Sequence, residues 1–311
     1  MSDSFLASVV TLFLALIIDR IFGEPKSWHP LILFGRWVDN CQQRCQMPLS
    51  WPAFSQRLSG VLAWMLAVVP FLMAWYLLDA VLPAVILDAM AVLIVYFSIG
   101  WQSLREHGQA IATPLMKGDL VKARVAVGYI VSRDTQALSE EQVAKAGIES
   151  VLENGSDAVF APIFWFLVFG VPGAILYRLA NTLDAMWGYK TTKLLHFGWC
   201  AARVDDLLNY VPAKLVVISY GICGQFSSAM AAAKAPQARW KSPNAGPVMA
   251  AGAASLGLAV GGEAVYFGKT ESRPILGKGD APKAVDLSRA LNLVDKTLTL
   301  WLLVVVFLAL F

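Results

Sequence analysis

Charged residues are scarce in this 311-residue chain: Asp, Glu, Lys and Arg make up 15% of it, whereas hydrophobic residues make up 57%. An average soluble domain is about 25% charged. The net charge of +3 is small and no basic cluster stands out, so we expect no nucleic-acid partner. A chain with so few charges and so much apolar side chain is typical of a protein that lies in a lipid bilayer.

Cysteine and histidine are also scarce. No two cysteines form a Cys-x-x-Cys pair, and the histidines are far apart in sequence. Cys41 and Cys45 would share a face of a helix, but two thiols alone rarely hold a zinc ion, which needs a closely organised set of ligands. The sequence therefore gives no indication of a structural zinc site.

Long apolar runs predict the membrane helices, because about 18 or more such residues are needed to cross the hydrocarbon core. The runs at 58–78 and 81–99 qualify, and the very short link between them predicts a helical hairpin. The run at 5–18 carries no small-residue cleavage site, so we expect a first membrane helix and no cleavable signal peptide. The run at 298–311 is apolar to its last residue and predicts a final span.

Three further runs are interrupted. The run at 158–179 is long enough to span, but Gly and Pro residues at 170–173 break its middle. Basic residues flank it on both sides, so it either crosses against the positive-inside rule or dips into the bilayer and returns, as irregular backbone can where protein buries it. The run at 215–233 is diluted by Gly, Ser and Gln, and the small residues at 248–262 predict close packing on a neighbour.

Lysine and arginine residues locate the loops. They fall in blocks at 20–57, 105–145, 178–214, 234–241 and 269–296. The link near Asp79 has none, so by the positive-inside rule it faces away from the cytoplasm and the first two blocks lie inside. This orientation places the N-terminus outside.

The stretch at about 100–157 predicts a small polar helical lobe. Ser139 and Gln142 have the spacing of a capping box at a helix start, and 119–132 has the periodicity of an amphipathic helix. The sequence as a whole predicts an all-α, multi-pass integral membrane protein with a cytoplasmic helical lobe. It would form one membrane domain over 1–311 with about four to six membrane elements, some of them re-entrant.

Three acids, Glu149, Glu153 and Asp157, are four residues apart and would stack on one face of a continuing helix. For Glu149, a solvated face relieved by Lys145 explains the pattern as well as a site does. The polar cluster that begins at Glu153 lies directly before a membrane run, which favours a site there. Carboxylate oxygens suit Mg²⁺, which takes one or two carboxylates and completes its shell with water and phosphate oxygens.

A second concentration of polar side chains lies between two apolar segments further along the chain. Asp205 and Asn209 are four residues apart and hence on one helical face, while Asp206 adds a neighbouring carboxylate. Arg203 offers a bidentate fork for a carboxylate or phosphate. Upstream lie Asn181, Thr182, Asp184, Tyr189 and Lys190. Alone, this upstream group is typical of a helix end that meets water; with the Asp205 segment it predicts a site for a divalent metal and a polyanionic substrate.

Four shorter features are weaker. The run containing Ser242 and Asn244 has turn chemistry and needs no function as a turn. Arg133 either ends a helix of the lobe or contacts an anion. The stretch 262–270 approaches the pattern of a phosphate-binding loop, but its spacing is wrong and we expect no strand before it, so we reject it. Asp88 lies in a predicted span, where an acid is a functional candidate by default, unless it reaches the interface.

Taken in their order, these motifs are similar to those of the CobD/CbiB family of cobalamin biosynthesis. The matching segments are 22–25, 29–30, 35–36, 153–157, 161–162, 181–184, 188–189, 197–199, 202–206, 209, 212–213 and 242–246. The resemblance covers nearly the whole chain. Mild departures from the family pattern are Glu24 for Asp, Ala158 for Gly and Lys214 for Arg. Trp240 stands where many relatives have a histidine, which puts in doubt a histidine role near Asn244.

The resemblance implies an adenosylcobinamide-phosphate synthase of the bacterial inner membrane, with its active site on the cytoplasmic side. Such an enzyme joins the free propionate of adenosylcobyric acid to the amine of aminopropanol phosphate or ethanolamine phosphate. The resemblance also implies ATP and Mg²⁺. It is also compatible with other late cobalamin-assembly enzymes as partners and with a homo-oligomer.

Two rival functions remain. The related AmpE-like proteins would keep the architecture as membrane sensors without synthase activity, but they should lack the signatures at 205–206 and 242–246, which are intact in this sequence. A transporter should bury ionisable groups along its spans, where Asp88 is nearly alone.

The resemblance and the residue chemistry together suggest roles. The acids would hold Mg²⁺-nucleotide or activate the amine, basic side chains would contact phosphates, and amides would orient the corrinoid or the amine. The catalytic candidates are Asp157, Arg203, Asp205 and Asp206. The metal-binding candidates are Glu153, Asp157, Asp205 and Asp206. The substrate-binding candidates are Arg133, Asn154, Ser156, Asn181, Thr182, Asp184, Tyr189, Lys190, Asn209, Ser242 and Asn244.

Overall fold

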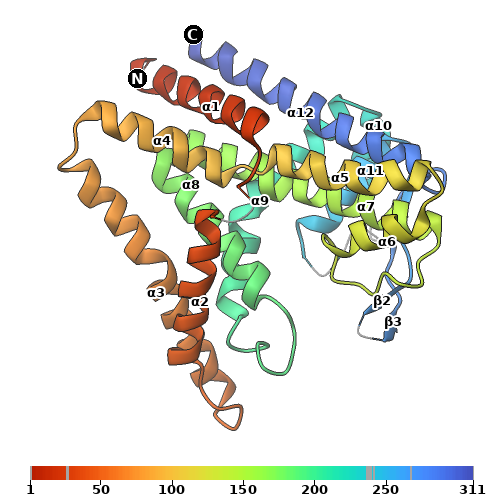
Figure 1. Ribbon diagram of the computed structural model, residues 1–311, viewed down its shortest axis with the longest axis horizontal. Coiled ribbons are helices and arrows are strands. Elements are labelled where there is room, and N and C mark those ends of the chain that lie inside the picture. The colour runs from red at the N-terminus through yellow and green to blue at the C-terminus, as the bar shows by residue number, and fades with distance from the viewer. Residues whose placement is uncertain (1, 26–27, 236–239, 241, 267, 311) are drawn as a thin grey trace. The chain divides into compact units, whose positions relative to one another are not determined.

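The computed structural model of the chain describes residues 2–25, 28–235, 240, 242–266 and 268–310. Helices dominate it, as Figure 1 shows. The helices are α1 (Ser2–Phe22), α2 (Pro30–Cys45), α3 (Ala53–Asp79), α4 (Ala84–Ser98), α5 (Trp101–Met116), α6 (Leu120–Gly128), α7 (Glu140–Asn154), the π-helix η1 (Gly155–Phe160), α8 (Ala161–Trp187), α9 (Trp199–Ile222), α10 (Phe226–Lys234), α11 (Ala245–Ser255) and α12 (Ala284–Leu310). The strands are β1 (Ala259–Gly261), β2 (Ala264–Tyr266), β3 (Lys269–Glu271) and β4 (Ile275–Gly277).

The chain forms two compact units, each built from two separate stretches of sequence. The first unit comprises Met1–Gly100 and Ala161–Asn209, and the second comprises Trp101–Phe160 and Tyr210–Phe311. Most of the stretch predicted as a polar helical lobe, about 100–157, lies in the second unit together with the C-terminal part of the chain.

Among the described residues, five helical segments are long and apolar enough to cross a membrane. They are Phe5–Phe22, Ala53–Asp79, Ala84–Met116, Glu140–Trp187 and Ala284–Leu310. Many large apolar side chains on them are exposed, for example Leu303 and Phe307 on α12, where lipid rather than water suits them. These findings confirm the prediction of a multi-pass helical membrane protein.

The first unit corrects one prediction. The short link between α3 and α4 predicted a helical hairpin, but the two helices diverge from the turn, as Figure 1 shows. Instead, α4 packs against α1 and α8, and α3 packs against α2 and α8. Small residues permit these contacts: Ala63 and Ala67 of α3 share a buried cluster with Leu183 and Trp187 of α8. A β-carbon at Gly60 of α3 would lie 2.0 Å from the carbonyl oxygen of Phe197, so only glycine fits there.

The predicted break in the run 158–179 is present. Gly170, inside α8, has φ 66° and ψ −152°, outside the helical region, a conformation that glycine adopts without steric cost. Pro172 follows and has no backbone N–H to donate. The kink is therefore confirmed, while the choice between a crossing and a re-entrant segment stays a prediction.

In the second unit, α7 packs against α5, α11 and α12. The capping box of Ser139 and Gln142 starts α7 as predicted, and the predicted amphipathic helix at 119–132 is the shorter α6. Close packing of the small residues after 248 is also confirmed. A β-carbon at Gly252 of α11 would lie 2.6 Å from the Leu152 side chain of α7.

Short strands follow α11 where we expected none. β1 pairs antiparallel with β4, and β2 pairs antiparallel with β3. Because β1 ends at Gly261, a strand does precede the stretch 262–270, contrary to the prediction. That stretch continues into β3 rather than into a helix, so it still lacks the form of a phosphate-binding loop.

Candidate functional site

Four side chains of the first unit join α8 to α9 through a chain of hydrogen bonds. The amide of Asn181 donates to Asp205 Oδ1 at 3.1 Å, and the amide of Asn209 donates to Asp205 Oδ2 at 3.0 Å. The hydroxyl of Tyr177 donates to Asn209 Oδ1 at 2.8 Å. Asp205 and Asn209 lie one turn apart on α9 and face Tyr177 and Asn181, one turn apart on α8. We call these four residues the Asp205 cluster.

The environment of Asp205 favours its protonated form. The residue is 9% exposed, and burial raises the pKa of its carboxyl to about 6, because a charge in a poorly solvated site is costly. The two amide hydrogen bonds from Asn181 and Asn209 lower this pKa, and the nearby carboxylate of Asp206 raises it. Asp205 therefore changes charge close to neutral pH, where a group that accepts or releases protons in catalysis works best.

The other site residues predicted near the Asp205 cluster in sequence are more exposed than Asp205 itself. Arg203 pairs with Asp206 at 3.7 Å, but its side chain is 66% exposed, so this pair contributes little stability. The Thr182 hydroxyl donates to the Arg178 carbonyl at 2.8 Å. The predicted residues Asp184, Tyr189 and Lys190 lie at the end of α8 and in the exposed segment after it.

The predicted polar cluster of the second unit coincides with the π-helix η1. Such turns are rare and frequently mark functional sites. In η1, Ser156 is buried and Asp157 is half-buried. A β-carbon at Gly155 would lie 2.6 Å from the hydroxyl of Tyr220, which donates to the Leu152 carbonyl at 3.0 Å.

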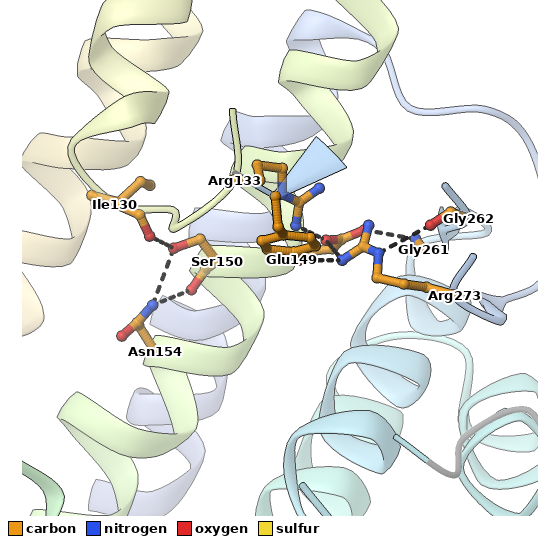
Figure 2. A network of polar contacts seen from close by, with 9 residues as sticks. Ile130, Arg133, Glu149, Ser150, Asn154, Gly261, Gly262 and Arg273 are labelled. Carbon is orange, nitrogen blue, oxygen red and sulfur yellow. Dashed lines mark hydrogen bonds and ion pairs between the residues drawn. The ribbon is translucent and has the colours of Figure 1, made fainter. Parts of the chain in front are cut away.

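Asn154, at the end of α7, has a local role in the structure. Its amide donates to the backbone carbonyl of Ser150 at 2.9 Å and to the Ser150 hydroxyl at 3.1 Å, while that hydroxyl donates to the Ile130 carbonyl at 3.3 Å (Figure 2). Glu153 lies beside it on α7, half-buried. The end of α7, which carries Glu153 and leads into η1, is thereby tied to the loop that follows α6.

Glu149 is the centre of a buried ion network that Figure 2 shows. Its side chain is 3% exposed. Glu149 accepts hydrogen bonds from Arg133, from Arg273 at 3.2 Å and from the backbone N–H of Gly261 at 2.7 Å. Lys145 pairs instead with Glu141, at 3.3 Å. A solvated face relieved by Lys145 is therefore wrong for Glu149.

The Glu149 network contains Arg133, which the sequence predicted as a site residue, and Arg273, which it did not. Arg133 was predicted to contact phosphates; its side chain is 9% exposed and is bound to Glu149. Arg273, from the segment between β3 and β4, was not predicted. The ring of Trp240 lies 5.1 Å from the Arg273 guanidinium, so this departure from the family pattern supplies a cation–π contact.

The turn at Ser242 and Asn244 is confirmed. The Ser242 hydroxyl accepts hydrogen bonds from the backbone N–H groups of Asn244 at 3.2 Å and Ala245 at 3.4 Å. Asn244 is buried and precedes α11. The turn thus fixes the start of that helix.

The metal candidates are divided between the units. Asp205 and Asp206 belong to the first unit, whereas Glu153 and Asp157 belong to the second. Among the described residues, no three or more His, Cys, Asp or Glu side chains are grouped so that they alone would hold a metal ion. The acids would need oxygens from a substrate to complete a magnesium shell, which is how this ion is usually bound.

Fold and site together define a class of protein: a multi-pass helical membrane protein with a buried carboxylate held by amides between two of its helices. The chain belongs to the CobD/CbiB family, since the family described as CobD/Cbib protein matches residues 12–294.

Curated relatives match almost from end to end. The chain is 50% identical over 296 residues to a protein named "Cobalamin biosynthesis protein CobD" from Stutzerimonas stutzeri, covering 94% of this chain and 95% of the relative. It is 49% identical to the protein of that name from Chromobacterium violaceum, covering 94% of each. The one from Rhodobacter capsulatus is 34% identical, with 90% of each covered. No solved structure matches the chain.

Proposed function

We propose that this protein is an adenosylcobinamide-phosphate synthase of cobalamin biosynthesis. It would join the free propionate of adenosylcobyric acid to the amine of aminopropanol phosphate or ethanolamine phosphate in an amide bond, with ATP as the energy source. The observation that carries the proposal is the near-full-length match to relatives named for cobalamin biosynthesis. The chemistry of the Asp205 cluster supports it.

The reaction sets two requirements. A carboxylate resists attack by an amine until it carries a leaving group, which phosphoryl transfer from ATP would provide. The attacking amine must also lose a proton before it can form an amide. Arg203 and Lys190, both exposed, are suited to phosphate groups because each brings a cation with several N–H donors.

Asp205 suits the second requirement. Its carboxyl has a pKa raised to about 6 by burial, so at neutral pH it is ionised and can accept the proton that the nitrogen loses as it attacks the activated carbonyl. The amides of Asn181 and Asn209 hold it in one orientation. Asp157, half-buried in η1, is the corresponding candidate in the second unit.

Each unit offers a pair of carboxylates that suits magnesium. Asp205 and Asp206 in the first unit, and Glu153 and Asp157 in the second, provide the oxygens that Mg²⁺ prefers. When bound, the ion would neutralise charge on the phosphate groups. We propose that the protein lies in the bacterial inner membrane with this chemistry on the cytoplasmic side, in keeping with the basic blocks predicted to lie inside. The proposal also includes other enzymes of late cobalamin assembly as partners, and a homo-oligomer as the assembly.

The purified protein in lipid nanodiscs tests the activity. With adenosylcobyric acid, ATP, Mg²⁺ and aminopropanol phosphate, mass spectrometry should detect adenosylcobinamide phosphate. A gene deletion provides a second test: growth should be restored by cobinamide and not by cobyric acid. An AmpE-like sensor would form no amide product, and rescue of the deletion by cobyric acid would remove the protein from this step.

A further inference from the structure

A partly buried polar cluster in the first unit lies where α1 ends, α2 begins and α8 passes. Glu24 follows α1, His29 starts α2 and Arg178 lies on α8. Asp19, in the last turn of α1, is fully buried. The sequence motifs included Glu24 and His29 only through the family resemblance, and nothing in the sequence singled out Arg178.

The ring of His29 presents a buried donor. Its Nδ1 accepts a hydrogen bond from the backbone N–H of Leu31 at 3.2 Å and so caps α2. Burial lowers the pKa of His29 below its usual value; the nearby Glu24 opposes this effect and Arg178 adds to it. The ring is therefore neutral at pH 7. Because Nδ1 accepts a hydrogen bond, the ring proton lies on Nε2. Nε2 is buried in a residue that is 7% exposed, and it has no hydrogen-bond partner among the described residues.

Arg178 is the second donor without a full set of acceptors. Its side chain is 15% exposed, and its ion-pair partner Glu24 is 4.0 Å away, measured between a guanidinium nitrogen and a carboxylate oxygen. Nε of Arg178 has no hydrogen-bond partner among the described residues. Buried guanidinium groups usually form short, often bidentate hydrogen bonds with their anions. Buried donors that are left unsatisfied destabilise a protein, so an anionic ligand would stabilise the site.

The Glu24 carboxylate restricts what kind of anion fits. It is close enough to His29 and Arg178 to influence the charge of the histidine and to pair with the arginine. A polyanion such as a nucleotide would be repelled by this carboxylate. A small molecule with an ammonium group at one end and a phosphate at the other matches both signs of charge.

We propose that Arg178, His29 and Glu24 bind the amino-alcohol phosphate. The guanidinium of Arg178 and Nε2–H of His29 hold its phosphate, and the carboxylate of Glu24 holds its ammonium. This assignment names the site of one substrate and rests on the proposed function for the reaction that uses it.

Calorimetric binding of O-phosphoethanolamine to the full-length protein in nanodiscs tests the site without turnover. Arg178→Gln should weaken binding by about tenfold or more, the loss of one charged hydrogen-bond partner. Glu24→Gln should weaken binding of O-phosphoethanolamine and leave 2-hydroxyethyl phosphate, which has no amine, unaffected. His29→Ser keeps an oxygen that can cap α2 and removes the Nε2–H donor, so it should weaken both ligands.

Arg44→Gln on α2, where the arginine is exposed, is the matched control and should bind as the wild type does. Arg178→Lys keeps the positive charge but loses the planar guanidinium that can donate two parallel hydrogen bonds. It replaces Arg178→Gln as the test variant if Arg178→Gln does not fold. Unchanged affinity in folded Arg178 and Glu24 variants overturns the proposal. The proposal is also overturned if the wild type fails to bind O-phosphoethanolamine even when adenosylcobyric acid and a non-hydrolysable ATP analogue are present. Equal weakening of both ligands by Glu24→Gln overturns the ammonium assignment.

The two proposals fail in distinguishable ways. If the wild type binds O-phosphoethanolamine but forms no amide product, the synthase proposal is wrong and the binding site stands. If the wild type forms product and the variants keep its KM for the amino-alcohol phosphate, the synthase stands and this site is wrong. KM for adenosylcobyric acid should stay unchanged in all three variants.

Discussion

The side-chain amide of Asn181 donates a hydrogen bond to Oδ1 of Asp205, 3.1 Å away, and this bond ties α8 to α9. It gives an otherwise poorly solvated carboxylate one of its two amide partners. The protonation of Asp205 therefore depends on a residue 24 positions earlier in the chain.

The pH dependence of activity should report this bond. If ionised Asp205 accepts the amine proton, kcat/KM of the wild type should fall as the pH drops below about 6. Asn181→Ala removes a bond that lowers the pKa of Asp205, so its acid limb should shift upward by about half to one unit. Initial rates between pH 5 and 8 at about the same ionic strength measure the shift. An acid limb that stays in place in Asn181→Ala would contradict this role for Asn181.

Stability should depend on pH through the same group. The pKa of Asp205 is raised from 3.8 to about 6 in the folded protein, so between these values the unfolded chain loses its proton first. Stability should therefore fall as the pH rises from about 4 to about 6, by about 3 kcal/mol, and change little above that range. Thermal unfolding of Asp205→Asn, which cannot ionise, should lack this decline; a decline of the same size would refute the assignment.

Neutralising Glu149 should destabilise the second unit strongly. Glu149→Gln leaves the buried Arg133 and Arg273 without their carboxylate, and breaking such a network costs about 3–5 kcal/mol. Glu141→Gln is the control, because Glu141 is 52% exposed and its pair with Lys145 contributes less than about 1 kcal/mol. Denaturant unfolding in detergent compares the two variants, and equal losses would show that the Glu149 network carries no special stability.

Gly155 and Tyr220 should be coupled. A β-carbon at Gly155 would lie 2.6 Å from the Tyr220 hydroxyl, so Gly155→Ala should cost about 1–3 kcal/mol through overpacking. Tyr220→Phe removes the oxygen that clashes. In the double variant, Gly155→Ala should therefore cost less than it does alone, which a double-mutant cycle of unfolding free energies measures. Additive effects would place the clash elsewhere.

Local patterns in the sequence predicted much of this structure. The four-residue spacing of Asp205 and Asn209 predicted their shared face, and the glycines at 170–173 predicted the kink in α8, because both depend on neighbours along the chain. The capping box of Ser139 was predicted for the same reason. These features need no knowledge of tertiary packing.

What the sequence did not predict depends on distant partners. Arg273 lies 124 residues from Glu149, so no local pattern indicated that Glu149 is neutralised by arginines. The link after α3 predicted a hairpin, but α4 finds its partners in α1 and α8. Each of the four strands is three residues long and lies in a glycine-rich segment, too short for a recognisable alternation.

The most direct test of the central claim is product formation by the wild type and by Asp205→Asn, reconstituted in equal amounts in nanodiscs. With adenosylcobyric acid, ATP, Mg²⁺ and aminopropanol phosphate, the wild type should form adenosylcobinamide phosphate. Asp205→Asn, which keeps the size of the side chain, should form it about a hundredfold or more slowly. No product from the wild type, or full turnover by both Asp205→Asn and Asp157→Asn, would contradict the account.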